Sequence, residues 1–257
     1  MPDALFILPF LFGAVVGSFL NVCICRLPEK VSVVSPPSRC PACGASIPFY
    51  YNIPIIGWFV LRGKAACCGA PLSIKYPLVE ALTAVFAALL AIKFGIGVEL
   101  FVYFAFVSAL IVVTFIDLKH QIIPDVISLP GIVIGLILSW VMPVGIVDAL
   151  IGAAFGGGIL FGIAAAYLLL TGHDGMGGGD IKLLAMIGAF LGWKGVIVTL
   201  LLGSFLGAFV GVIFMAFAGK GSKFPIPFGP FLALGALAYL FFGEELISWY
   251  IMRAVGA

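Results

Sequence analysis

Two aspartates stand where an apolar stretch of the chain meets a polar one. Asp117 ends the apolar run 98–116, and Asp180 follows three consecutive glycines, 177–179, and precedes another apolar run. A charged side chain at a membrane boundary is costly, so it is by default a functional hypothesis. Two carboxylates held close together share one proton, so that one activates water as a general base while the other acts as a general acid. The pair therefore predicts aspartyl peptide hydrolysis.

Each acid also has a structural interpretation. Asp180 could cap the helix that follows it, and Asp125, which precedes an apolar run, fits a helix cap well. Asp117 fits a cap less well, because it follows a helix end, where the helix dipole disfavours an anion. A proton-coupled transporter is the competing function, since intramembrane acids and glycine-broken helices also serve transport. A zinc-binding membrane scaffold is a third.

Two histidines lie near the acids. His173 and Asp174 precede the glycines, and His120 follows Asp117 by three residues. A histidine–aspartate pair is also found in metal sites and catalytic triads, but the chain has only two histidines and lacks a serine elbow motif. We therefore interpret these residues as parts of solvated loops.

The composition sets the class of protein. The 257 residues are 63% hydrophobic and only 9% charged, whereas soluble domains carry about 25% charged residues. The sequence predicts an all-α polytopic membrane protein with about eight transmembrane helices in a lipid bilayer. No dense basic face is present, which argues against nucleic acid as a partner. The predicted spans are 4–24, which we expect to be retained rather than cleaved as a signal peptide, then 77–97, 98–116, 126–142, 147–170, 182–193, 195–218 and 228–250.

The basic residues predict the orientation. With the N-terminus outside and the spans alternating, the outer side holds only Lys93, Lys194 and Arg253 of the 13 basic residues. Because basic loops stay in the cytoplasm, this arrangement predicts that both aspartates lie at the cytoplasmic face. The cytoplasmic side then holds the other ten: Arg26, Lys30, Arg39, Arg62, Lys64, Lys75, Lys119, Lys182, Lys220 and Lys223.

The loop after the first helix carries most of the cysteines. Thiolates at C-x2-C spacing bind tetrahedral zinc, and two such pairs complete one site. The second pair is irregular here, because Ala65 stands where the partner of Cys68 would lie. A zinc staple and simple reduced thiols both stay open, while a cytoplasmic loop argues against stable disulfides. The candidate ligands are Cys40, Cys43, Cys67 and Cys68.

Motifs in order along nearly the whole chain resemble those of the type IV prepilin peptidases, which are bifunctional leader peptidases and N-methyltransferases. The first helix is similar at 17–22 and 26–28, and the loop at 40–43, 51–55, 61–64 and 76–80. The segments 115–117 with 123–125, and 177–184 with Gly188 and 192–193, resemble the two catalytic segments. The departure from the family pattern is Ala65.

The resemblance implies a bacterial inner-membrane, multi-pass enzyme with its catalytic face in the cytoplasm. Asp117 and Asp180 would be the catalytic pair of a Gly-x-Gly-Asp protease, supported by Gly177, Gly179, Lys182 and Asp125. The substrates would be prepilin or pseudopilin precursors, cleaved after their basic leader and then methylated on the new N-terminus with S-adenosylmethionine as donor, and zinc would be a second cofactor. Three parts are expected: a first transmembrane helix (1–25), a cytoplasmic loop associated with zinc and methyl transfer (26–76), and a membrane-embedded peptidase domain (77–257).

Overall fold

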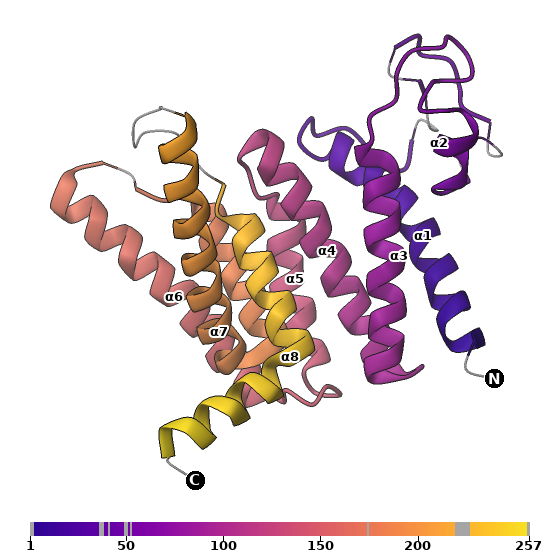
Figure 1. Cartoon of the computed structure of the whole chain (residues 1–257). Helices are drawn as coiled ribbons and strands as arrows, with labels where there is room; N and C mark the ends of the chain where they lie inside the picture. The colour runs from indigo at the N-terminus through magenta and orange to yellow at the C-terminus, as the bar shows by residue number, and fades with distance from the viewer. Residues whose placement is uncertain are drawn as a thin grey trace. The chain divides into compact units, whose positions relative to one another are not determined.

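The computed structural model describes residues 3–35, 39–40, 42–48, 51, 53–173, 175–218 and 227–255. These residues form helices and loops, with two isolated β-bridges in the loop after the first helix (Figure 1). The chain divides into two compact units, Met1–Val112 and Val113–Ala257. The predicted all-α fold is confirmed. The helices are α1 (Asp3–Arg26), α2 (Ile56–Val60), α3 (Lys75–Phe94), α4 (Val98–His120), α5 (Asp125–Leu138), α6 (Ile146–Thr171), α7 (Gly178–Ala218) and α8 (Gly229–Val255).

The apolar helices are those of a polytopic membrane protein. Among the described residues, α1, α3, α4, α6 and α7 are long and apolar enough to cross a membrane, and α5 and the first part of α8 are shorter apolar helices. Large side chains on them, such as Leu169 and Phe217, are more than four-fifths exposed. Such exposure is costly in water and favourable in lipid. All eight predicted spans lie mainly within these helices.

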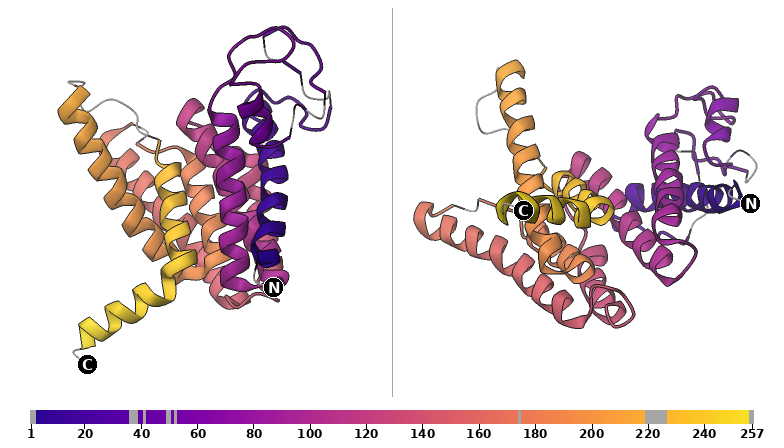
Figure 2. Two further views of the ribbon diagram at one scale, coloured as in Figure 1. Left: turned by 45° about the vertical axis from the view of Figure 1, so that its right-hand side comes forward. Right: turned by 60° about the horizontal axis from the view of Figure 1, so that its bottom comes forward.

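The first unit is built on α1 and α3, which lie side by side (Figures 1 and 2). A Cβ on Gly13 would approach Thr83 and Ala84, and a Cβ on Gly17 would approach Glu80, so the two helices run antiparallel at close range. The absence of side chains at these two glycines allows this approach. The loop between the helices contains α2 and the β-bridges, and it lies at the C-terminal end of α1.

The second unit is organised around α7, which reverses direction part-way along. Gly192 has φ 71° and ψ 179°, a conformation that interrupts the helix and that glycine adopts without steric cost. The first limb of α7 runs antiparallel to α6, since Gly152 faces Gly188 and Gly156 faces Leu184. The sequence predicted two spans separated near Lys194. The structure confirms two helical limbs but places the break at Gly192.

The second limb of α7 packs on α8. Gly203 lies against Phe231 and Gly235 against Thr199, so these two segments are also antiparallel. The reversal at Gly192 therefore returns the chain to the end of the unit where the first limb began. The start of α8 lies at this end, close to the end of α4.

Candidate active site and metal centre

Asp117 lies in the last turn of α4 and is 5% exposed. Its Oδ2 accepts a hydrogen bond of 3.0 Å from the backbone N–H of Gly229, the first residue of α8. A helix N-terminus carries unpaired N–H groups and a partial positive charge, so it is a favourable partner for a carboxylate. A Cβ on Gly229 would lie 2.7 Å from the same oxygen. Glycine is thus required for this contact.

Gly229 was not among the site residues predicted from the sequence. It is 112 residues from Asp117 in sequence, and the contact depends on how α8 packs against the end of α4. The available signal was Gly229-Pro230 at the start of an apolar run, because proline is frequent in the first turn of a helix. That signal locates a helix start but does not indicate which side chain it binds.

Asp180 lies in the first turn of α7 and is half-buried. A Cβ on Gly179, the preceding residue, would lie 2.9 Å from the Ile123 Cβ, and a Cβ on Gly229 would lie 3.4 Å from the Ile123 Cδ1. Ile123 therefore contacts the backbones next to both acids. The carboxylates of Asp117 and Asp180 are close enough to interact electrostatically. The second unit thus brings together the two acids that the sequence singled out.

Lys182 and Asp125 form an ion pair beside this site. Lys182 Nζ lies 2.7 Å from Asp125 Oδ1, and both side chains are more than one-third exposed. The pair joins the first turn of α5 to the second turn of α7. We had interpreted Asp125 as a helix cap. The N-cap residue is Pro124, which makes no side-chain capping hydrogen bond, and the Asp125 carboxylate bonds to Lys182 instead.

The two histidines are exposed. His120 is exposed at the end of α4, and the His173 Nδ1 lies 2.8 Å from the Thr171 carbonyl in an exposed loop. His173 agrees with the interpretation of a solvated loop, whereas His120 is the exposed last residue of the helix α4. Gly177 is exposed, and a Cβ there would lie 4.0 Å from the Asp180 Oδ2. Asp174, Lys220 and Lys223 lie outside the described residues.

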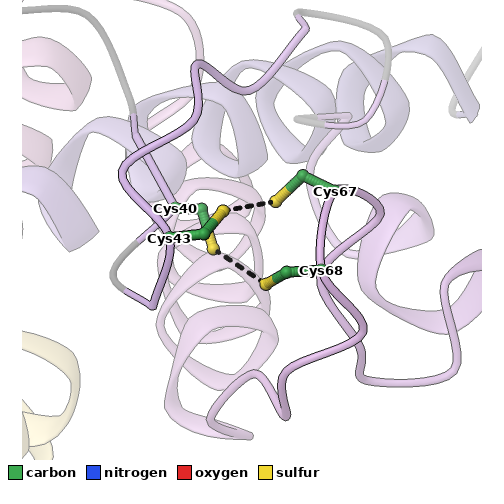
Figure 3. A group of neighbouring side chains, drawn as sticks. All are labelled: Cys40, Cys43, Cys67 and Cys68. Carbon is green, nitrogen blue, oxygen red and sulfur yellow. Dashed lines mark hydrogen bonds between the residues drawn. The ribbon is translucent and has the colours of Figure 1, made fainter.

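The four loop cysteines gather in one cluster (Figure 3). Cys40 Sγ lies 3.7 Å from Cys68 Sγ, and Cys43 Sγ lies 3.3 Å from Cys67 Sγ. All four sulfurs lie within 4.8 Å of one another. A tetrahedron of thiolates around zinc, with bonds of about 2.3 Å, separates its sulfurs by about 3.8 Å. The donor set therefore fits a tetrahedral thiophilic metal such as zinc.

Two turns of the same shape hold this cluster. In the first, the Cys40 N–H donates to the Ala45 carbonyl and the Gly44 N–H to the Cys40 carbonyl, at 2.8 and 2.9 Å. The second has the same bonds, from the Ala65 N–H to the Ala70 carbonyl and from the Gly69 N–H to the Ala65 carbonyl, both at 2.8 Å. Gly44 and Gly69 have φ of 73° and 71°, and each turn is closed by a β-bridge, Arg39 to Ser46 and Lys64 to Pro71.

This repeat explains the irregular spacing. Ala65 occupies the place in the second turn that Cys40 occupies in the first, and Cys68 matches Cys43. Cys67 therefore contributes the fourth sulfur from a position that corresponds to Ala42. The cluster keeps four thiols although the second turn lacks one of its two regular ligand positions.

The thiols of this cluster differ in acidity. Backbone N–H groups of Cys43 and Ala42 lower the pKa of Cys40 to about 6. A hydrogen bond to the Cys43 thiol, followed by a weaker effect of a hydrogen bond to the Cys40 thiol, raises the pKa of Cys67 to about 12. Because metal ligands must be thiolates, metal binding to this cluster would release protons.

Residues 11–94 match the bacterial peptidase A24 N-terminal domain, and residues 104–212 match the type IV leader peptidase family. A prepilin leader peptidase/N-methyltransferase of Aeromonas hydrophila is 38% identical, covering 98% of this chain and 95% of the relative. The chain belongs to the type IV leader peptidase family.

Other members of this family are similar over almost their whole length. Proteins of the same name from Xanthomonas campestris and Pseudomonas aeruginosa are each 36% identical, covering 94% and 98% of this chain and 93% and 96% of the relative. No solved structure matches the chain. Membership of a peptidase family confirms the prediction that the protein is an enzyme and favours it over the transporter and the scaffold. The cysteine cluster lies in the first matched segment and both acids in the second.

Proposed function

We propose that this protein is a prepilin leader peptidase and N-methyltransferase of the bacterial inner membrane, with Asp117 and Asp180 as its catalytic dyad. The observation that carries the proposal is the pairing of these two acids at one end of the second unit. The names of the relatives agree with it, since each is a prepilin leader peptidase/N-methyltransferase.

The two acids would divide the chemistry of hydrolysis. The hydrogen bond from Gly229 favours a charged Asp117, so we assign the shared proton to Asp180. Asp117 would take a proton from water while the water oxygen attacks the peptide carbonyl carbon, and Asp180 would give its proton to the carbonyl oxygen. The tetrahedral intermediate would collapse by breaking the C–N bond as the proton held by Asp117 passes to the departing nitrogen and one hydroxyl of the intermediate returns a proton to Asp180.

The glycines before Asp180 suit the approach of a substrate. A Cβ on Gly178 would meet no atom within 4 Å, and both Gly177 and Gly178 are exposed. An extended peptide could therefore pass close to this backbone. The basic leader of a prepilin or pseudopilin precursor would remain at the cytoplasmic face, and its apolar segment would lie in the bilayer. The scissile bond between them would then lie at the membrane surface.

The methyl transfer is assigned to the first unit. S-adenosylmethionine would supply the methyl group, which passes to the neutral N-terminal amine of the cleaved precursor as the carbon–sulfur bond breaks and the amine loses a proton to solvent. Cys40, Cys43, Cys67 and Cys68 would hold zinc in a structural role, because a loop of this length needs a staple to fold. Closed sites of four cysteines are typical of structural zinc.

Co-expression with a pilin-like precursor tests the proposal. Intact-mass measurement of the precursor should show the loss of a basic leader and the gain of one methyl group. Asp117→Asn and Asp180→Asn should each abolish the loss of the leader, while Asp148→Asn, which removes an acid from the first turn of α6 in the same unit, should leave it intact. Normal processing by either dyad variant would refute the assignment.

A further inference from the structure

The first unit contains a cavity of about 210 Å³ beside the cysteine cluster. Its walls come from the C-terminal part of α1, the loop that follows and the start of α3. The lining combines one acid, Glu80, with the basic Arg39 and the aromatic Trp58 and Tyr76. Cys40 and Cys67 also face it. None of these groups takes part in the proposed hydrolysis.

Glu80 is the unusual member of this lining. It is 7% exposed although it lies in the apolar helix α3. Its Oε2 accepts a hydrogen bond of 2.7 Å from the backbone N–H of Ile55, and the Ser18 hydroxyl also bonds to the carboxylate. A buried acid in a membrane helix is costly to maintain and marks a functional site. The two hydrogen bonds hold its carboxylate in place within the cavity wall.

The Ile55 backbone is strained. Its φ of 63° and ψ of −57°, with a 2.6 Å hydrogen bond from the Ile56 N–H to the Pro54 carbonyl, define a γ-turn of the rare positive-φ form. Such a conformation is a genuine outlier for a β-branched residue. Strain of this kind persists where the surroundings enforce it, and it is concentrated at functional sites. Here the turn directs the Ile55 N–H to Glu80.

We propose that this cavity binds S-adenosylmethionine, with Glu80 recognising the positive charge of its sulfonium. The inference rests on the proposed methyltransferase function and adds to it a binding site. The donor carries an aromatic base, a sulfonium cation and a carboxylate, which Trp58, Glu80 and Arg39 complement in turn. Sites that enclose a whole drug-sized ligand measure roughly 300–1,000 Å³. At about 210 Å³, this cavity would enclose only part of the donor and leave the remainder at its mouth.

Binding measurements on the full-length protein in detergent test this assignment without any precursor. Titration calorimetry would compare S-adenosylmethionine with S-adenosylhomocysteine, which has the same groups but no sulfonium charge. Glu80→Gln keeps an acceptor for the Ile55 N–H and removes only the negative charge. We expect it to weaken binding of S-adenosylmethionine by about tenfold or more and binding of S-adenosylhomocysteine by less than about twofold.

Two further variants complete the test. Glu99→Gln, at the start of α4 in the same unit, should bind both compounds like the wild type. Trp58→Leu should weaken both compounds together, because it removes an aromatic face without altering charge. Equal binding of S-adenosylmethionine by Glu80→Gln and the wild type would overturn the assignment, as would a Trp58→Leu variant that binds both compounds normally.

The outcomes separate this inference from the proposed function. A wild-type protein that methylates its precursor, but whose donor binding is insensitive to Glu80, would retain the function and lose the site. A protein that binds the donor through Glu80, yet neither cleaves nor methylates a precursor, would retain the site and lose the function.

Discussion

The two units position their reactive groups by different means. In the second unit, Asp117 and Asp180 are placed by backbone atoms, since Gly229 donates to one acid and Gly179 lets Ile123 approach next to the other. In the first unit, the turns of a loop do the positioning: two hydrogen-bonded turns bring the four sulfurs together, and the N–H of the γ-turn at Ile55 holds Glu80. Packed helices support the acids, whereas hydrogen-bonded turns of a loop support the cysteine cluster.

This difference indicates how each activity would be lost. A site built on packed helices tolerates few changes at its glycines, because added atoms displace backbone. A site built on a short loop depends on whatever staples the loop. The two proposed activities should therefore respond to different substitutions.

The largest expected effect is on cleavage. Asp180→Asn removes a group that handles a proton in the transition state, and such groups contribute about 10²–10⁴-fold in rate. We expect cleavage to fall by about 10³-fold while methylation of a precursor supplied without its leader changes by less than about twofold. Mass spectrometry of both products in one time course measures the two rates. Parallel loss of both would show that the units do not act separately.

The second prediction concerns the irregular cysteine. Structural zinc binding is worth about 10–16 kcal/mol over four ligands, so the loss of one is expected to weaken binding on the order of 100-fold. Cys67→Ala should show this loss in metal content measured by elemental analysis. Adding Ala65→Cys to that variant should restore binding, because position 65 matches Cys40 in the repeated turn. A double variant that stays metal-free would contradict the correspondence between the two turns.

The third prediction concerns the contact that our sequence analysis missed. Gly229→Ala would place a Cβ 2.7 Å from the Asp117 Oδ2 and displace the N–H that binds it. A hydrogen bond to a charged group is worth about 1.5–3 kcal/mol, so cleavage should fall by roughly 10–100-fold. Gly158→Ala is the matched control, because a Cβ there meets nothing within 4 Å. Comparison of kcat for the two variants measures the effect, and equal values would remove Gly229 from the site.

The sequence predicted the parts of each site that lie in local motifs. Hydrophobic runs identified the helical segments, and their apolar ends identified Asp117 and Asp180. The four cysteines were named as a set, although Ala65 left their grouping open. A local pattern was enough to predict these features, because a membrane span is one continuous apolar segment and metal-binding cysteines recur at short spacings.

The missed features depend on packing between distant segments. The bond from Gly229 to Asp117 spans 112 residues, and that from Ile55 to Glu80 spans 25. The sequence predicted the break between the two spans at Lys194, two residues after the observed reversal at Gly192. A single glycine with positive φ makes this turn, so no polar loop marks it in the sequence. The ion pair of Asp125 replaced the expected cap because Lys182 lies on a neighbouring helix, which no spacing rule indicates.

That ion pair should have the smallest effect of the four. Lys182→Gln breaks a 2.7 Å contact between partly exposed side chains, and exposed pairs are worth about 0–1 kcal/mol. The pair joins the starts of α5 and α7, next to Ile123 and Asp180, so its loss should reach the dyad only through small shifts of these helix ends. We expect cleavage to fall by no more than about fivefold, and by less at high salt, where the pair is already screened. Asp125→Asn should reproduce the effect, and the double variant should be no worse than either single one. A Lys182→Gln variant as inactive as Asp180→Asn would instead place Lys182 in contact with the substrate.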